Sequence, residues 1–149
     1  MFEIYQRLDH IHHVDIADEI PLDHLLREKS RFRIQTKAGV EARVILERGK
    51  PLLPGDILLS ACGKQLLVSG APEPVVTART DDWATFSRAC YHLGNRHVRL
   101  QLGERWLRIT PDHVLEDLLS SLGLKVVRED AVFEPDPGAY GKRHGSHAH

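Results

Sequence analysis

Apolar and polar residues alternate along several short stretches in the first half of the chain, with the period of two that is typical of β-strands. The alternation is clearest in FEIYQRL near the start, in RFRIQT and in EARVILE. Two further apolar runs, 57–61 and 65–69, flank a turn at Gly63-Lys64, and IPLDHLLREKS is compatible with one short helical turn. These patterns predict a small, mostly β domain over residues 1–70.

The pattern changes after GAPEPV, whose two prolines predict a linker at 71–75. Beyond it, PVVTAR, VRLQL, RWLRI and KVVREDAVF alternate as strands do, and a tight hairpin at Gly103-Glu104 joins the second to the third. DDWATFSRACYHLG and TPDHVLEDLLSSLG have the 3.6-residue period of amphipathic helices. The order βαββαβ predicts a ferredoxin-like domain over residues 76–134, with both helices on one face of a four-stranded antiparallel sheet. The expected fold class is therefore α+β.

The two predicted helices also carry signals for where they begin and end. Gly94 is expected at C′ of the first helix, the position just past its C-terminal cap. In the second helix, Thr110 is the expected N-cap, Pro111 the first helical residue and Gly123 the stop. The predicted apolar stripes are Trp83, Phe86, Ala89, Cys90 and Leu93 in the first helix, and Val114, Leu115, Leu118, Leu119 and Leu122 in the second.

Composition and motifs argue against several classes of function. The 20 basic and 21 acidic residues nearly cancel, which argues against binding nucleic acid through bulk electrostatics. No apolar run approaches the ~20 residues that span a bilayer, and MFEIYQRLDH lacks the regions of a secretory signal, so we expect a cytoplasmic protein. Cys62 and Cys90 are isolated, and we assign chemistry to neither. GxSxG, phosphate-loop and HExxH motifs are all missing from the sequence, which indicates that the protein is not an enzyme.

Histidine is the compositional outlier, with 10 residues in 149, and neutral imidazole is the commonest metal ligand in proteins. His97 lies where the first helix turns into the next strand and is expected to be exposed. No acid or cysteine is close to it in the sequence. It is therefore either a solvated turn residue or one ligand of a site completed from elsewhere in the fold, or by the same histidine of a second copy.

The other histidines are secondary candidates or lie in the tail. Residues 135–149 have almost no apolar content and are predicted to form a disordered tail. His92 lies in the last turn of the first helix and His113 in the first turn of the second, while His10, His12 and His13 are expected in a polar loop. The tail carries an HxxHxH pattern whose imidazoles suit Ni(II), Cu(II), Zn(II) or Co(II), at His144, His147 and His149.

Three segments, YHLGNRHVRLQ, DHVLEDLLSSLG and FEPDPGAYGKRHGSHAH, together resemble the urease accessory nickel chaperone family, UreE. LERGKPLLPGDILL and APEPV are also similar to that family. The resemblance implies an N-terminal domain like the peptide-binding domain of heat-shock co-chaperones, followed by a ferredoxin-like metal-binding domain. It further implies a homodimer in which His97 of each chain binds nickel, with His92, His113 and the tail histidines as additional ligands. The implied partners are apo-urease and its maturation proteins, including the GTPase UreG.

Two other interpretations remain open at this stage. The N-terminal β domain could bind polypeptide in a co-chaperone or scaffold whose histidines are incidental. The protein could also be a general copper or zinc buffer, because imidazole sites bind copper more tightly than nickel.

Overall fold

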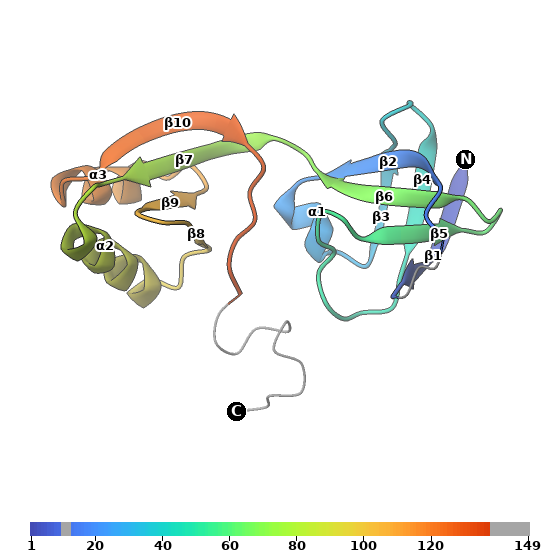
Figure 1. Cartoon of the computed structure of the whole chain (residues 1–149), viewed down its shortest axis with the longest axis horizontal. Helices are drawn as coiled ribbons and strands as arrows, with labels where there is room; N and C mark the ends of the chain where they lie inside the picture. Colours follow the sequence, from blue (N-terminus) through green and yellow to red (C-terminus); the bar gives the residue numbers. More distant parts are fainter. Residues whose placement is uncertain (10–12, 138–149) are drawn as a thin grey trace. The chain divides into compact units, whose positions relative to one another are not determined.

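The computed structural model describes residues 1–9 and 13–137 of the chain. These residues form two compact units, one ending at Ala71 and the other beginning at Pro72 (Figure 1). Each unit has its own hydrophobic core. In the described part of the chain, no helix has both the length and the apolar character needed to cross a lipid bilayer.

The N-terminal unit is a six-stranded sheet of order β2-β6-β5-β1-β4-β3. The pairs β1–β4 and β2–β6 are parallel, and the other neighbours are antiparallel. The core lies along alternate strand positions and includes Ile4, Val44, Leu58, Leu66 and Val68, all 0% exposed. The elements are β1 (Phe2–Leu8), β2 (Ile16–Leu22), α1 (His24–Glu28), β3 (Arg31–Gln35), β4 (Glu41–Ile45), β5 (Ile57–Ser60) and β6 (Gln65–Gly70).

The strand β2 was not predicted from the pattern. Its sequence, IADEIPL, contains Asp18, Glu19 and Pro21, which are all rare in strands. The structure accommodates them because β2 is an edge strand that pairs only with β6, so the missing N–H of Pro21 leaves no ladder bond unmade.

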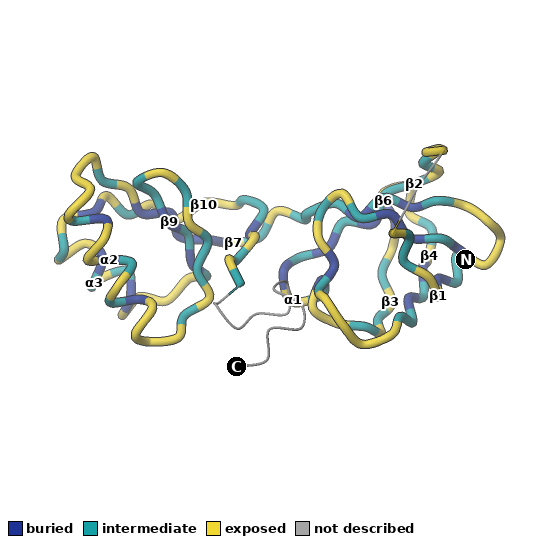
Figure 2. The backbone as a smooth tube through the Cα atoms, turned by 60° about the horizontal axis from the view of Figure 1, so that its bottom comes forward, coloured by how far each residue is buried: buried dark blue, intermediate teal, exposed yellow. Residues whose placement is uncertain are grey.

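The C-terminal unit has the predicted ferredoxin-like order, with an antiparallel sheet β10-β7-β9-β8. Both helices cover the same sheet face, since both contribute to one core with β7 and β9, and the tube of α2 alternates between buried and exposed residues (Figure 2). The elements are β7 (Glu73–Arg79), α2 (Trp83–Asn95), β8 (Gln101–Leu102), β9 (Trp106–Ile109), α3 (His113–Ser121) and β10 (Lys125–Ala131). The core is formed by Val76, Ala78, Phe86, Ala89, Leu93, Leu107, Ile109, Leu115, Leu119 and Leu124.

Several boundaries differ from those expected. The segment expected to be a linker overlaps β7, which begins at Glu73; Pro74 is tolerated there because pairing with β9 starts only at Val76. The strand β8 is shorter than VRLQL, because its pairing with β9 is confined to Gln101 and Leu102. The hairpin between β8 and β9 forms at Gly103, where a Cβ would lie 1.9 Å from the Trp106 ring.

The start of α3 and parts of both apolar stripes also need correction. Asp112, not Thr110, is the N-cap, since its carboxylate accepts from the backbone N–H groups of the first turn. Pro111 therefore lies outside the helix. Val114 and Trp83 are 63% and 53% exposed, so both point away from the core that their stripes were expected to join.

Candidate metal centre

The end of α2 determines how His97 is presented. The helix continues through Gly94 to Asn95, so Gly94 is a helical residue and not the C′ residue that was predicted. The Val98 N–H donates to the Leu93 carbonyl over 3.5 Å, and the His97 N–H donates to the Gly94 carbonyl over 3.1 Å. These two bonds are the pattern of a Schellman motif, in which the C′ residue takes a left-handed conformation. His97 is that residue, with φ 55°.

The end of α3 provides a direct comparison within the same unit. There the Leu124 N–H donates to the Leu119 carbonyl over 3.1 Å, and the Gly123 N–H donates to the Ser120 carbonyl over 3.0 Å. The motif is the same, but its C′ residue is a glycine with φ 102°. Left-handed backbone costs an ordinary L-residue energy that glycine avoids. A histidine at this position is therefore unusual, and such outliers cluster at functional sites.

The backbone beneath His97 is held by packing. Leu93 is 0% exposed in the core, and Val98 packs against the same core. This apolar contact across the motif is the one that commonly accompanies a Schellman end. The His97 side chain, by contrast, is exposed, as the sequence predicted. The result is an exposed imidazole on a backbone that cannot shift without disturbing the core.

His92 lies on the last turn of α2 and is half-buried. Its ring packs edge-on against Tyr91, with the centroids 5.7 Å apart. Its backbone carbonyl accepts from Nη1 of Arg96 over 3.4 Å. These contacts are those of a structural residue at a helix end.

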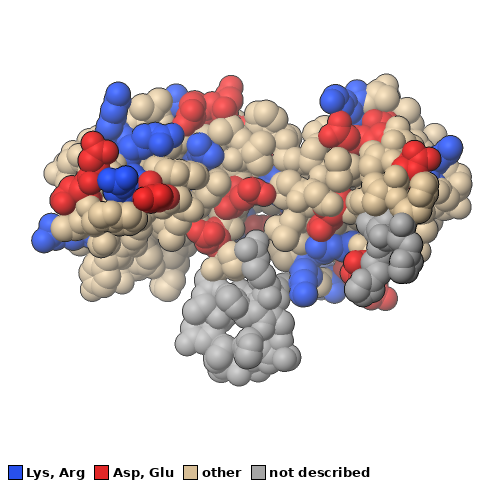
Figure 3. Space-filling model, viewed as in Figure 1, with Lys and Arg blue, Asp and Glu red and all other residues tan. Residues whose placement is uncertain are grey.

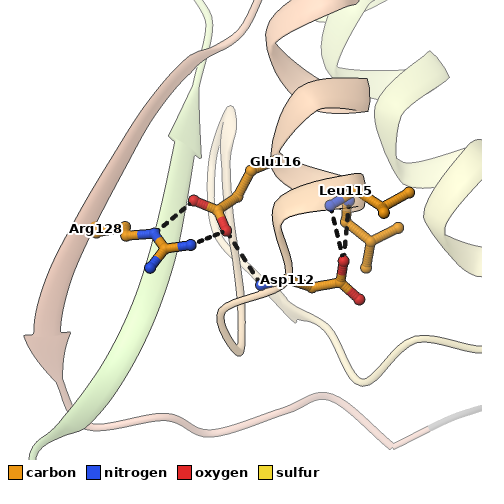
Figure 4. Close-up of polar contacts among 5 residues, drawn as sticks. Asp112, Leu115, Glu116 and Arg128 are labelled. Carbon is orange, nitrogen blue, oxygen red and sulfur yellow. Dashed lines mark hydrogen bonds and ion pairs between the residues drawn. The ribbon is translucent and has the colours of Figure 1, made fainter.

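His113 is the first residue of α3 and is exposed. The adjacent N-cap is held twice: the Asp112 carboxylate accepts from Leu115 N–H over 3.2 Å, and Glu116 Oε2 accepts from the Asp112 N–H over 3.1 Å (Figure 4). Glu116 also receives two bonds of 2.8 Å from the guanidinium of Arg128 on β10. This network attaches the start of α3, and with it His113, to the edge strand of the sheet.

The Glu116–Arg128 pair predicts a specific acid sensitivity. The hydrogen bonds from Arg128 hold the pKa of Glu116 below its ordinary value. A carboxylate whose pKa is lowered by folding stabilises the folded state above its unfolded pKa, and this stabilisation is lost as the pH falls through the lowered value. Between about pH 5 and pH 3, a window set by the ordinary glutamate pKa of about 4.3, wild type should lose more unfolding free energy than Arg128→Ala. Urea denaturation across this range checks it, and equal losses in the two proteins would contradict it.

The described residues do not assemble a complete metal site by themselves. No group of three or more histidine, cysteine, aspartate or glutamate side chains in residues 1–9 and 13–137 is arranged to hold a metal ion. The predicted ligands His144, His147 and His149 lie outside the described residues, as do His10 and His12. His13 is exposed. His97 thus stands without further ligands grouped around it in the described part of the chain.

The cysteines differ in their surroundings. Burial raises the pKa of the Cys90 thiol, in keeping with its position against the core. Cys62 is exposed, and a contact of 3.1 Å with the Ser60 hydroxyl lowers the pKa of its thiol.

Comparison with known proteins assigns the chain to a family. Residues 4–69 match the model of the UreE urease accessory protein N-terminal domain, and residues 73–149 match that of its C-terminal domain. The urease accessory protein UreE of Alteromonas mediterranea is 53% identical over 147 residues, covering 99% of this chain and 95% of that protein. The UreE of a Marinomonas species is 52% identical, covering 99% of this chain and all of that protein. The chain belongs to the UreE family.

The UreE family assignment accounts for the fold and confirms the resemblance read from the sequence. A third relative, the UreE of Psychromonas ingrahamii, is 50% identical over 149 residues and covers this whole chain. Two features of this UreE-family chain were not apparent from its sequence. They are the left-handed backbone at His97 and the hydrogen bonds of Asp136, which falls inside the predicted tail but bonds to the strand β8 and the residues just before it.

Proposed function

We propose that this UreE-family chain is a cytoplasmic nickel metallochaperone that delivers Ni(II) to apo-urease during assembly of the urease active site. In this proposal, two chains form a homodimer, and His97 of each chain binds the same ion. The tail histidines His144, His147 and His149 act as auxiliary ligands, with His92 and His113 in lesser roles. The maturation proteins that receive the ion include the GTPase UreG, and the protein itself catalyses no reaction.

The observation that carries this proposal is the presentation of His97. Its imidazole is exposed and its backbone has φ 55°, while Leu93 at the end of the same helix is fully buried in the core. One histidine does not hold a transition metal, so the isolated ligand becomes useful when a two-fold axis doubles it. A site with few protein ligands and an open coordination sphere exchanges its ion readily, which suits transfer and does not suit storage.

The general features of the surface are consistent with association between copies of the chain. Lys and Arg side chains are interspersed with Asp and Glu over the face seen in Figure 3, and the net charge of the chain is −1. Two copies therefore meet with little overall electrostatic repulsion.

Nickel calorimetry combined with light scattering tests the proposal. We expect the tightest site to hold one Ni(II) per two chains and to weaken as the pH falls through the histidine range, because protons compete for the imidazole nitrogens. His97→Ala should lose this site, while His13→Ala, which removes an exposed histidine outside the proposed ligand set, serves as the control and keeps it. A tightest site that survives His97→Ala would refute the central assignment.

Selectivity among metals is a separate arm of the same experiment. Imidazole ligands bind Cu(II) more tightly than Ni(II) in general, so competition in the test tube does not decide the cargo. Metal analysis of the protein isolated from cells with active urease distinguishes the two functions. Copper or zinc in the His97 site under nickel-replete conditions would favour a metal buffer.

A second candidate function rests on a groove in the N-terminal unit. A groove of about 830 Å³ is lined mostly by charged and polar residues, among them Arg7, Glu28, Arg31, Arg48 and Lys50, with Leu46 and Leu52 among the few apolar ones. Such charged and hydrogen-bonding groups offer partners to an extended polypeptide, the ligand of a co-chaperone or scaffold. If nickel binding proves independent of His97, this is the better account of the chain.

A further inference from the structure

One face of the C-terminal sheet is covered by α2 and α3, and the opposite face carries the side chains that alternate with the core residues of the strands (Figure 1). Part of this second face is closed by the chain itself. Val75 and Thr77 on β7 are only 1% exposed, and the Val132 carbonyl, just after β10, accepts from Nη1 of Arg108 on β9 over 3.4 Å. In the described part of the chain, the other end of this face, where β7 ends and β10 begins, is accessible.

Three residues lie directly opposite one another in a row across this accessible end. Lys125 on β10 pairs with Arg79 on β7, and Arg79 pairs in turn with Trp106 on β9. Both cations are exposed and Trp106 is half-buried, while Val127, the next β10 residue on the same face, is 42% exposed. We call Arg79, Trp106, Lys125 and Val127 the basic patch.

The two cations of the basic patch face each other without a carboxylate between them. Like charges directly opposite each other destabilise an antiparallel pair of strands. Within residues 1–9 and 13–137, neither Arg79 nor Lys125 forms an ion pair with a carboxylate. Glu129, the acid on the same face of β10, lies 3.7 Å from Arg108 instead. The patch therefore carries two positive charges that carboxylates from outside the chain would neutralise.

Trp106 orients the centre of the patch and gives it an apolar surface. Cζ of Arg79 lies 6.0 Å from the centroid of the Trp106 ring, and Cζ of Arg108 lies 4.9 Å from it. These cation–π contacts hold the Arg79 guanidinium over the ring. The ring also packs against Gly103 so closely that a Cβ would have no room there. Tryptophan and arginine are among the residues that most often dominate the binding energy of protein interfaces.

We propose that the basic patch is a docking surface for an acidic segment of a partner protein. Two carboxylates of the segment pair with Arg79 and Lys125, which lie on strands about 4.8 Å apart, and an apolar side chain of the segment covers Trp106 and Val127. A polypeptide is favoured over a nucleic acid because guanidinium groups already cover the ring on which a base would stack. The net charge of −1 also gives no bulk attraction for phosphates. The inference does not depend on nickel binding at His97.

NMR titration of the metal-free, full-length protein with a synthetic acidic peptide locates the docking surface. The probe is a peptide with three glutamates on each side of a central phenylalanine. We expect the largest shift changes at the amides of Lys125 and Val127 and at the indole N–H of Trp106. The same peptide with alanine in place of phenylalanine should bind roughly threefold to tenfold more weakly, because it loses the apolar contact with the patch.

Lys125→Glu distinguishes docking from a purely structural role. The charge reversal should weaken binding of the peptide roughly threefold to tenfold, since it removes an attraction and adds a repulsion. It should also raise the urea midpoint of the C-terminal unit, because a pair of opposite charges replaces a pair of like charges across β7 and β10. Arg88→Glu is the matched control, with the same change of charge at an exposed position on α2, which covers the other face of the sheet. Its affinity for the peptide should stay within about twofold of wild type.

Three results of the titration would overturn the inference. They are shift changes confined to the groove of the N-terminal unit, an affinity that Lys125→Glu leaves unchanged, and tighter binding of an oligothymidylate than of the peptide at the basic patch. A urea midpoint that falls in Lys125→Glu would remove its physical basis, because the two cations would then not repel each other. Since the titration uses no nickel, its outcome is independent of the proposed function, which stands or falls with nickel binding to wild type and His97→Ala.

Discussion

His97→Gly is expected to abolish the tightest nickel site while leaving the free energy of unfolding unchanged or raised by up to about 1 kcal/mol. The binding loss is expected because His97 is the only histidine that the proposal places at the centre of the site. The substitution removes it from both chains of the dimer. Loss of a single outer partner of a metal ligand typically costs 10–100-fold in affinity, so loss of the ligand itself should exceed about a hundredfold. Nickel calorimetry measures this loss.

The stability part of the prediction comes from the backbone. A left-handed conformation costs a residue other than glycine about 1–2 kcal/mol, and less for histidine, which tolerates it better. Replacing His97 by glycine removes this strain, but glycine also has more conformational entropy in the unfolded chain, which offsets part of the gain in unfolding free energy. His97→Ala removes the imidazole but keeps the strain. The expected order of stability is therefore glycine variant, wild type, alanine variant, with nickel binding lost in both variants. A glycine variant less stable than the alanine variant would contradict the left-handed conformation.

Gly123→Ala on α3 is the matched control for this argument. It places a Cβ in the same motif at φ 102°, and no atom within 4 Å would meet that Cβ, so the cost comes from the backbone alone. We expect a loss of about 1 kcal/mol or more. Nickel affinity should not change, which separates the backbone effect from the metal site.

The largest loss of stability is expected from Leu93→Ala. Leu93 is 0% exposed, and its carbonyl accepts the Val98 N–H that closes the end of α2. Truncating a buried leucine removes its transfer free energy and leaves a cavity, for a total of about 2–5 kcal/mol. The variant should also loosen the helix end that presents His97, so its nickel affinity should fall even under conditions where the unit is still folded.

Urea denaturation followed by tryptophan fluorescence is suited to this test. Both tryptophans of the chain, Trp83 and Trp106, lie in the C-terminal unit, so their signal reports that unit separately. Val114→Ala is the control: its side chain is 63% exposed on α3, and the change should stay within about 0.5 kcal/mol. A loss below about 1 kcal/mol in Leu93→Ala would mean that this end of α2 is not closed by core packing.

Most elements of the fold could be predicted because their signals are local. The period-two runs around Ile4, Val44 and Val68 and the 3.6-residue stripes of α2 and α3 are visible within windows of five to fifteen residues, and the βαββαβ order follows from them. The strand β2 could not be predicted in this way. Its residues pair because β6 offers a free edge, a condition set by residues nearly 50 positions further along the chain.

The sequence by itself determined the α+β class, the ferredoxin-like order, the family and the exposed position of His97. It did not reveal that His97 occupies a glycine-type backbone position, because the local pattern placed the helix end at Gly94, whereas α2 continues to Asn95 with Leu93 and Val98 packed against the core. Nor did it reveal the two hydrogen bonds of Asp136, whose partners lie 34 and 36 residues earlier and have no local signature. The physical reason is the same in both cases: a periodic pattern reports which face of an element is apolar, whereas backbone strain and edge pairing depend on which distant segments the packed core brings together.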